Sequence, residues 1–241
     1  MTAMLEVAGV SKNFSGLRAL QEVSFNVPQG EIVGLIGPNG AGKTTCFNLI
    51  AGVFRADQGQ VTLGGQRIDG WRADQVCRAG IGRTFQLVKP FAGLSVLENV
   101  IVGALKAAPK VGAARDIAES VIEQLGLGAK RDDAASSLTL PERKRLEVAR
   151  ALATQPRILL LDEVMAGLRP TEMDQMVKLF RELNAKTGLT ILLIEHVMRA
   201  VMALSNRIVV LHHGQVISAG TPAQVTQDPA VLECYLGEEG V

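Results

Sequence analysis

The hydrophobic positions of the chain follow two different periods. In residues 1–89 and 154–241, short runs either alternate between apolar and polar residues, as in half-buried strands, or are continuously apolar. Continuously apolar runs are typical of strands that are covered on both faces of a parallel sheet. The runs that we expect to form strands are 5–8, 23–27, 30–36, 61–63, 157–161, 190–194, 208–211 and 215–219.

The middle of the chain has the period of helices instead. Between residues 96 and 125 alanines are frequent, and apolar residues recur at spacings of three and four. Similar patterns predict helices over 44–51, 140–153, 170–185, 198–204 and 229–236, and a short helix after Pro222. Strands that alternate with helices predict an α/β fold with a mainly parallel sheet. We expect one domain, with a core over about 1–89 and 154–241 and an inserted helical subdomain over about 90–153.

Composition excludes several classes of protein. The 241 residues are 47% hydrophobic and 20% charged, which is the composition of a globular chain and not of a disordered one. With 25 Lys and Arg against 24 Asp and Glu, the net charge of +1 provides no basic field for nucleic acid. No apolar stretch approaches the ~18 residues that span a membrane, and no signal-peptide pattern opens the chain. Three widely spaced cysteines indicate a reducing compartment, so we expect a cytoplasmic protein.

A phosphate-binding loop follows the apolar run over 30–36. Residues 37–45 read Gly-Pro-Asn-Gly-Ala-Gly-Lys-Thr-Thr, which satisfies G-x-x-x-x-G-K-[ST] between a strand and a helix, as the motif requires. The glycines let successive backbone N–H groups point into one concavity at the positive end of the helix. Lys43 would reach the β- and γ-phosphates, and Thr44 would offer its hydroxyl to Mg²⁺. The loop therefore predicts a bound nucleotide.

Two carboxylates follow the apolar run over 157–161. Adjacent residues of an extended chain point in opposite directions, so Asp162 and Glu163 can serve different purposes. Asp162 can hold the Mg²⁺ shell, while Glu163 faces a water in line with the γ-phosphate. Asp-Glu pairs are also common at solvated strand ends, but the phosphate-binding loop favours the functional interpretation.

Four further elements narrow the choice among nucleotidases. They are Arg83-Thr84-Phe85-Gln86, the helix start Leu138-Thr139-Leu140-Pro141-Glu142, the segment Ala166-Gly167-Leu168-Arg169, and His196. Together with the two motifs, this order resembles the ATP-binding cassette of ABC transporters over essentially the whole chain. The resemblance implies an ATPase with a P-loop NTPase (RecA-like) core, N-terminal antiparallel strands and an inserted helical subdomain. It also implies that ATP and Mg²⁺ are the cofactors.

The resemblance assigns roles to individual residues. It implies that ATP is bound by Phe14, which stacks on adenine, and by Gly37, Asn39, Gly40, Ala41, Gly42, Lys43, Thr44 and Thr45. The implied catalytic residues are Glu163 as general base, His196 on the γ-phosphate, Lys43, and Gln86, which also senses the membrane partner. The implied Mg²⁺ ligands are Thr44, Gln86 and Asp162, and the ATP of the opposite subunit contacts Thr139 and Glu142. Alternatively, Phe14 is a core residue, Gln86 a loop amide and His196 a polar residue at a strand end.

A closer resemblance is to the branched-chain amino acid transporter subgroup. It is carried by residues 46–52, 82–86, 163–172, 195–196 and 235–238. This resemblance implies import of branched-chain amino acids or related small amides, with permease subunits, a second ATP-binding subunit and a substrate-binding protein as partners. No nucleic acid is expected, and the chain would lie on the inner face of the cell membrane. The alternatives are an ABC ATPase of lipopolysaccharide export, a soluble ABC ATPase outside transport, and a non-catalytic nucleotide sensor.

Two positions depart from the family pattern: Arg169, where the family usually carries Asp or Asn, and the signature. The usual Leu-Ser-Gly-Gly-Gln signature reads Leu138-Thr139-Leu140-Pro141-Glu142. Pro141 removes an N–H that could face phosphate, and Leu140 blocks the closest approach of the backbone. Thr139 and Glu142 still form a capping box, so an ordinary capped helix is the alternative. We expect this chain to contribute a weakened half to one composite site in a heterodimer, with a homodimer as the alternative.

Overall fold

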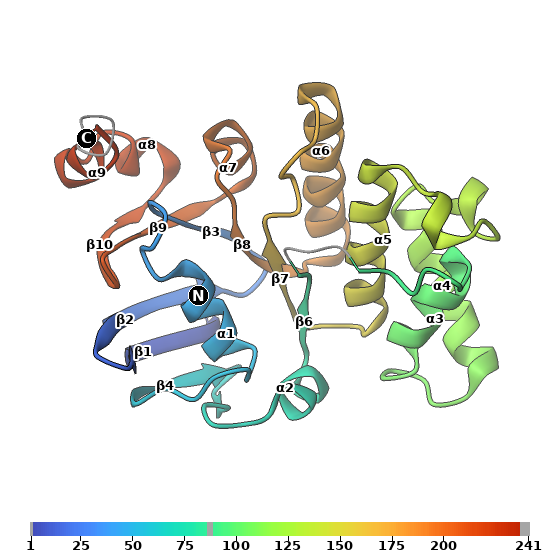
Figure 1. Ribbon diagram of the computed structural model, residues 1–241, viewed down its shortest axis with the longest axis horizontal. Helices are drawn as coiled ribbons and strands as arrows, with labels where there is room; N and C mark the ends of the chain where they lie inside the picture. The colour runs from blue at the N-terminus through green and yellow to red at the C-terminus, as the bar shows by residue number, and fades with distance from the viewer. Residues whose placement is uncertain (1, 86–88, 237–241) are drawn as a thin grey trace.

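Two β-sheets form the larger part of the molecule (Figure 1). The computed structural model describes residues 2–85 and 89–236. The first sheet is antiparallel, with the strands in the order β2 (Leu17–Pro28), β1 (Ala3–Phe14), β4 (Gln58–Leu63) and β5 (Gln66–Arg67). The second sheet has the order β10 (Gln215–Gly220), β9 (Arg207–His212), β3 (Ile32–Ile36), β8 (Thr190–Ile194), β7 (Ile158–Asp162) and β6 (Ile81–Arg83). Its pairs are parallel except β10 with β9, which confirms the predicted fold class.

The central strands separate two hydrophobic cores. Alternate residues of β3, β7 and β8 point to opposite faces of the sheet, and all residues of these strands are buried. One face packs against α1 (Lys43–Ile50) and the antiparallel sheet, with Phe47 of α1 fully buried between the two sheets. The other face packs against α6 (Pro170–Thr187) and α7 (Met198–Leu204). Figure 1 shows α6 and α7 on the side of the second sheet opposite α1.

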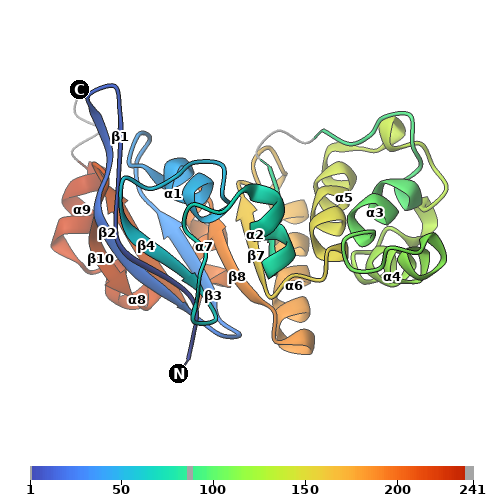
Figure 2. The ribbon, with the colours of Figure 1, turned by 90° about the horizontal axis from the view of Figure 1, so that it is seen from below.

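Three helices lie together beyond β6 and β7 (Figure 2). They are α3 (Val96–Ala104), α4 (Val111–Gln124) and α5 (Leu140–Ala153), with 3₁₀ turns at Gly128–Lys130 and Ala135–Ser137. All three lie within the segment for which a helical subdomain is predicted, and its boundaries stay a prediction. The bounds predicted for α5 are those observed. Near the C-terminus, α8 (Pro222–Val225) and α9 (Pro229–Leu236) also lie where short helices are predicted.

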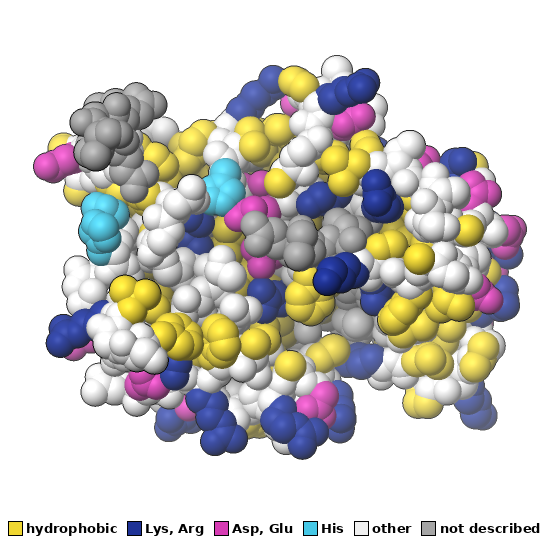
Figure 3. Space-filling model, viewed as in Figure 1, with side chains coloured by type: hydrophobic (Ala, Val, Ile, Leu, Met, Phe, Trp, Pro, Cys, Tyr) yellow, Lys and Arg dark blue, Asp and Glu magenta, His cyan; other side chains and the backbone are white. Residues whose placement is uncertain are grey.

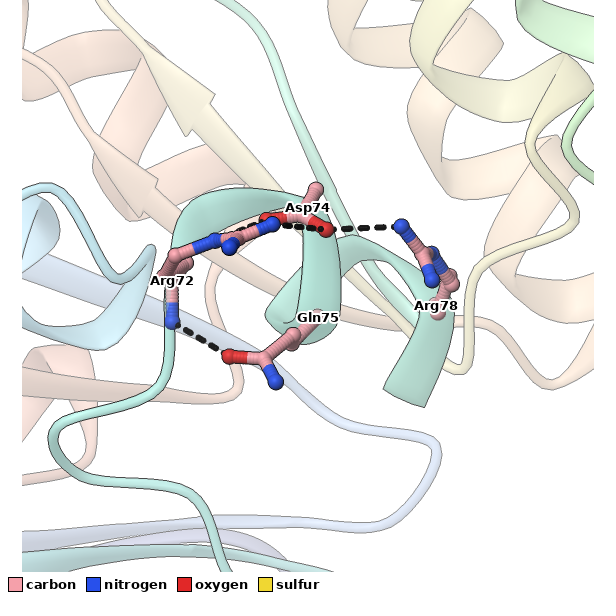
Figure 4. A network of polar contacts seen from close by, with 4 residues as sticks. All are labelled: Arg72, Asp74, Gln75 and Arg78. Atoms are coloured by element: carbon pink, nitrogen blue, oxygen red, sulfur yellow. Dashed lines mark hydrogen bonds and ion pairs between the residues drawn. The ribbon is translucent and has the colours of Figure 1, made fainter.

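One helix that the pattern does not predict is α2 (Ala73–Ala79). It has a single buried side chain, so the apolar repeat of an amphipathic helix is missing. Polar contacts stabilise it instead (Figure 4): the Arg72 backbone N–H donates to Gln75 Oε1 at 3.0 Å, and the Asp74 carboxylate accepts from the guanidinium groups of Arg72 and Arg78. These charges are exposed, so each ion pair contributes little by itself, and the helix depends on them together with the capping bond to Gln75 and the packing of Val76.

The three-residue strand β6 also has no signal in the pattern, because it is too short to show an alternation. It forms because its backbone pairs in parallel with β7, beginning with Ile81 opposite Ile158. Within the described part of the chain, the helices are too short or too polar for any of them to cross a bilayer.

Candidate functional site

The carboxyl ends of β3, β7 and β8 meet at one edge of the second sheet, where ligands bind in open α/β sheets. A cleft of about 790 Å³ lies there. Its walls come from the phosphate-binding loop, the turn between β1 and β2, and the residues that follow β7 and β8. The lining residues are Phe14, Leu17, Arg18, Ala19, Asn39, Gly40, Ala41, Gly42, Lys43, Thr44, Thr45, Glu163 and His196. The cleft thus brings together the predicted aromatic residue, the phosphate-binding loop and two predicted catalytic residues.

The phosphate-binding loop requires glycine at two of its positions for reasons of space. Gly37 has φ 147°, and a Cβ there would collide with the carbonyl oxygen of Leu211. Gly42 has φ 102°, and a Cβ there would lie 2.6 Å from the carbonyl oxygen of Ala19. Both values of φ are in the left-handed region that favours glycine. The loop therefore passes close to its neighbours and ends at the N-terminus of α1, where backbone N–H groups attract anions.

Lys43 is buried inside this loop, with 6% of its surface exposed. Its Nζ donates hydrogen bonds to the carbonyl oxygens of Gly37 at 2.6 Å and of Pro38 at 2.8 Å. These bonds close the loop around the ammonium group. A positive charge is therefore held at the centre of the loop on the wall of the cleft, where phosphate oxygens would be bound.

Phe14 is a cleft residue and not a core residue. It ends β1 and is 37% exposed. Its ring packs edge-on against Phe54, with the centroids 5.2 Å apart and the planes at 70°. Leu17, at the start of β2, is 69% exposed on the same wall of the cleft. An apolar platform is therefore available to a flat aromatic ligand such as adenine.

We expect the Phe14→Ala variant to raise the KM for ATP by about 5- to 150-fold, because stacking of a base on an aromatic ring is worth ~1–3 kcal/mol. The kcat should change little, since a ring that stacks on the base would contact it equally in the ground state and the transition state. Steady-state phosphate release at varied ATP checks this. Phe14→Tyr keeps the ring and should stay near wild type, and an unchanged KM in Phe14→Ala would remove Phe14 from the site.

Glu163 and His196 come from adjacent strands and contact each other. His196 Nε2 lies 2.5 Å from Glu163 Oε1. The Glu163 side chain is 13% exposed and the His196 side chain 44%, so the imidazole lies nearer to solvent. The Glu163 backbone N–H donates to the carbonyl oxygen of Ile194 at 2.9 Å, which fixes the start of the turn after β7 to the end of β8. The arrangement places a carboxylate and an imidazole together on the cleft wall.

Asp162 is buried, is not among the residues that line the cleft, and is held by an arginine. It is 3% exposed, and its Oδ2 accepts from the Arg83 guanidinium at 3.0 Å. Arg83 also donates to Asn48 Oδ1 at 2.7 Å. Burial raises the pKa of Asp162, while the hydrogen bond and charge of Arg83 act to lower it. The arginine therefore favours the ionised form of this carboxyl, against the effect of its burial.

Thr139 and Glu142 are not brought to the cleft. Both lie at the N-terminus of α5, where the Thr139 backbone N–H and hydroxyl donate to Glu142 Oε2 at 2.8 Å each. The pKa of Glu142 is lowered mainly because of these two hydrogen bonds. Among the described residues, neither lines the cleft of its own chain. Gln86 lies outside the described residues.

Sequence reasoning did not identify several residues at the site. Leu17 to Ala19 line the cleft only because the hairpin of β1 and β2 folds over the loop, and no motif marks them. Arg83 lies in the run over residues 83–86, in which only Gln86 was predicted to be a site residue. No pattern in the sequence marks Arg83, because β6, the strand that it ends, is itself not predicted, and its pairing with β7 beside Asp162 arises only in the fold.

The site combines a glycine-rich loop after β3, an Asp-Glu pair at the end of β7, and a histidine after β8, which lies between these two strands. Together they define a P-loop ATPase of the ATP-binding-cassette type. Comparison with known proteins agrees with this class. Residues 20–166 match the family model described as "ABC transporter", and residues 215–241 match the one described as "Branched-chain amino acid ATP-binding cassette transporter". The chain belongs to the ABC transporter family, as an ATP-binding and ATP-hydrolysing subunit.

Individual relatives cover the chain from end to end. It is 40% identical to the high-affinity branched-chain amino acid transport ATP-binding protein LivG of Escherichia coli (strain K12), over 98% of both chains. It is 37% identical to BraF of Pseudomonas aeruginosa, which carries the same description, over 98% of both chains. The lipopolysaccharide export ATP-binding protein LptB of Acidithiobacillus ferridurans is 36% identical over 99% of both. The solved ADP conformation of the cassette MJ1267 is 31% identical with a TM-score of 0.89, covering 98% of this chain and all of that one.

Proposed function

We propose that this chain hydrolyses ATP to power the import of branched-chain amino acids, or of related small amides. The observation that carries the proposal is the 40% identity to LivG over 98% of both chains. The match of residues 215–241 to the branched-chain family model supports it independently of the catalytic motifs. The lipopolysaccharide-export protein is less similar, at 36% identity, and remains the second candidate.

In the proposed reaction, ATP lies in the cleft with its adenine on Phe14 and its phosphates in the loop over 37–45. Glu163 accepts a proton from the attacking water, whose oxygen bonds to the γ-phosphorus as the bond to the bridging oxygen breaks. ADP and inorganic phosphate leave. Lys43 and the backbone N–H groups stabilise the charge that develops on the transferred group. His196, 2.5 Å from Glu163, would hold the γ-phosphate from the same side.

Thr44 and Asp162 would hold Mg²⁺. Their hydroxyl and carboxylate oxygens are hard ligands of the kind that Mg²⁺ prefers, so the donor chemistry fits this ion. When bound, Mg²⁺ supplies positive charge to the β- and γ-phosphates. Arg83 supports this role by favouring the ionised form of Asp162. Gln86 is the third proposed ligand.

We further propose that two subunits close head to tail over two nucleotides, so that Thr139 and Glu142 contact the ATP of the opposite subunit. Their position outside their own cleft supports this arrangement. The cassette MJ0796, which is 25% identical over 91% of this chain, has a dimeric structure bound to ADP and Pi. The altered signature favours a heterodimer, because Leu140 and Pro141 occupy the first two positions of α5, where a glycine backbone would approach phosphate.

The double variant Leu140→Gly, Pro141→Gly should raise the ATPase rate of the assembled transporter several-fold. It restores one backbone N–H and opens the approach to the nucleotide of the opposite subunit. Phosphate release by the purified complex measures the effect. Leu140→Ala with Pro141→Ala is the control that restores the N–H and keeps a Cβ. An unchanged rate in a folded double-glycine complex would contradict the idea of a weakened half-site.

A second hollow is the proposed docking site for the permease subunits. It measures about 620 Å³ and lies between α2, β6, α3 and α5. Three of its lining residues are large apolar side chains with high exposure: Phe85 at 59%, Val53 at 52% and Val102 at 42%. Figure 3 shows hydrophobic side chains gathered over α3, on the right of the view. Exposed apolar patches of this kind mark interaction surfaces.

Affinity purification of the tagged chain from detergent-solubilised native membranes tests the proposed assembly. Mass spectrometry should identify two permease subunits and a second ATP-binding subunit. The chain itself should be recovered in the membrane fraction, as expected for a subunit bound to the inner face of the cell membrane. Recovery with lipopolysaccharide-transport subunits would support the export candidate instead. Recovery of the chain alone, from the soluble fraction, would contradict both.

A further inference from the structure

A buried lysine reaches the backbone of the proposed general base. Lys144 lies in the second turn of α5 and is 5% exposed. Its Nζ donates to the carbonyl oxygen of Glu163 at 3.1 Å. Lysine side chains are almost never buried without a partner, because desolvation of the ammonium group is costly. The burial of Lys144 therefore depends on what this hydrogen bond and the nearby carboxylates contribute.

A buried carboxyl group holds the same turn from the other side. Glu195 follows β8 and is 2% exposed, and its Oε1 accepts from the Met165 backbone N–H at 2.8 Å. Burial raises the pKa of Glu195 to about 7, while the bond from Met165 and the charge of Lys144 act to lower it and Glu163 acts to raise it. The turn that starts at Glu163 is thus held at two points. The carbonyl oxygen of Glu163 is bonded to α5, and the N–H of Met165 is bonded to Glu195, the residue that follows β8.

This turn contains an unusual backbone conformation. Glu163 has φ 50°, in the left-handed region that residues other than glycine seldom adopt. Such conformations persist where surrounding contacts hold them, and they are common at functional sites. At Glu163 the backbone N–H donates to the carbonyl oxygen of Ile194, and the carbonyl oxygen accepts from Lys144 Nζ and, within the turn, from the Ala166 backbone N–H at 3.2 Å. Of the two bonds to this oxygen, the one from Lys144 ties the turn to another element.

We propose that Lys144 and Glu195 are positioning residues that hold the Glu163 turn, and with it the Glu163 carboxylate, in the geometry required for hydrolysis. The proposal rests on the role of Glu163 as general base proposed above. Neither residue lines the cleft in the described part of the chain, so both act through the backbone of the turn. One consequence is that the position of the base depends on α5, the helix that also carries Thr139 and Glu142.

The test is the Lys144→Met variant, which keeps the length of the side chain and removes the donor. We expect kcat to fall about 10- to 100-fold, because small displacements of a catalytic group have effects of this size. The affinity for ATP should stay within about twofold, since the loop over 37–45 is untouched. Lys144→Arg keeps a donor and should recover most of the rate. Lys106→Met is the matched control, because Lys106 Nζ also donates to a backbone carbonyl, that of Thr154 at 2.9 Å, outside the cleft.

A double-mutant cycle separates positioning from a general loss of structure. If Lys144 acts through the Glu163 carboxylate, adding Lys144→Met to Glu163→Gln should cause no further loss of single-turnover rate. A further loss equal to that of the single variant would overturn the proposal, as would an unchanged kcat in folded Lys144→Met. If wild type itself does not hydrolyse ATP, the proposed function fails first and separately.

Lys144→Met also leaves Glu147 and Glu195 with less compensating charge, so its thermal unfolding is measured alongside. If it does not fold, Glu195→Ala and Glu195→Gln provide the same comparison. The glutamine keeps an acceptor for Met165 and should retain the rate, whereas the alanine should lose it. Equal rates in the two Glu195 variants would overturn the role of Glu195.

Discussion

The Glu163→Gln variant should bind ATP normally and hydrolyse it about 10²- to 10⁴-fold more slowly, which is the usual contribution of a general base. The amide has nearly the same shape as the carboxylate and can still contact His196, which lies 2.5 Å away in wild type. It cannot accept the proton of the attacking water. The loss should therefore appear in kcat and not in the affinity for ATP.

Single-turnover phosphate release and binding of a fluorescent ATP analogue measure the two quantities separately. Glu182→Gln is the matched control, because Glu182 lies on α6 with its side chain 48% exposed and away from the cleft. Near-normal turnover in Glu163→Gln would remove Glu163 from the role of base.

The Lys43→Met variant should lose about 30- to 5,000-fold in affinity for ATP, since truncation of one partner of a buried charged contact costs ~2–5 kcal/mol. Lys43 has two functions that methionine cannot replace. Its ammonium closes the loop by bonding the carbonyl oxygens of Gly37 and Pro38, and it supplies the positive charge at the centre of the loop.

Equilibrium binding of the ATP analogue measures this loss directly. Lys178→Met, at a lysine of α6 whose side chain is 77% exposed, is the control for removing one positive charge from the chain. Unchanged affinity in Lys43→Met would contradict the assignment of the loop as the phosphate site.

Much of the fold follows from local patterns in the sequence. The strands β3, β7 and β8 are continuously apolar because both their faces are covered, and α5 has a helical repeat with a capping box at its start. The helix α2 and the strands β5 and β6 were not predicted, because they have too few buried residues to show a period. Surface polar contacts stabilise α2, while β5 pairs with β4 and β6 pairs with β7, and a local pattern does not contain these contacts.

The candidate site also consists of residues that the sequence predicts and residues that it does not. The phosphate-binding loop and the Asp162-Glu163 pair are continuous motifs, so the sequence predicts them and the folded chain places the loop and Glu163 in one cleft. The sequence left open whether Phe14 is a binding residue or a core residue, because its exposure depends on the hairpin turn and not on its neighbours in sequence. The sequence pattern does not mark Lys144 or Glu195 as positioning residues, since their burial arises only when α5 and the residue after β8 pack on either side of the Glu163 turn.

The central claim is that ATP hydrolysis by this chain drives the uptake of branched-chain amino acids. The most direct measurement is the initial rate of uptake of radiolabelled leucine, at low external concentration, in cells of the source organism that lack this chain. The rate should fall on deletion, return with the wild-type chain and stay low with Glu163→Gln. Equal rates in the deletion strain and its parent would contradict the claim.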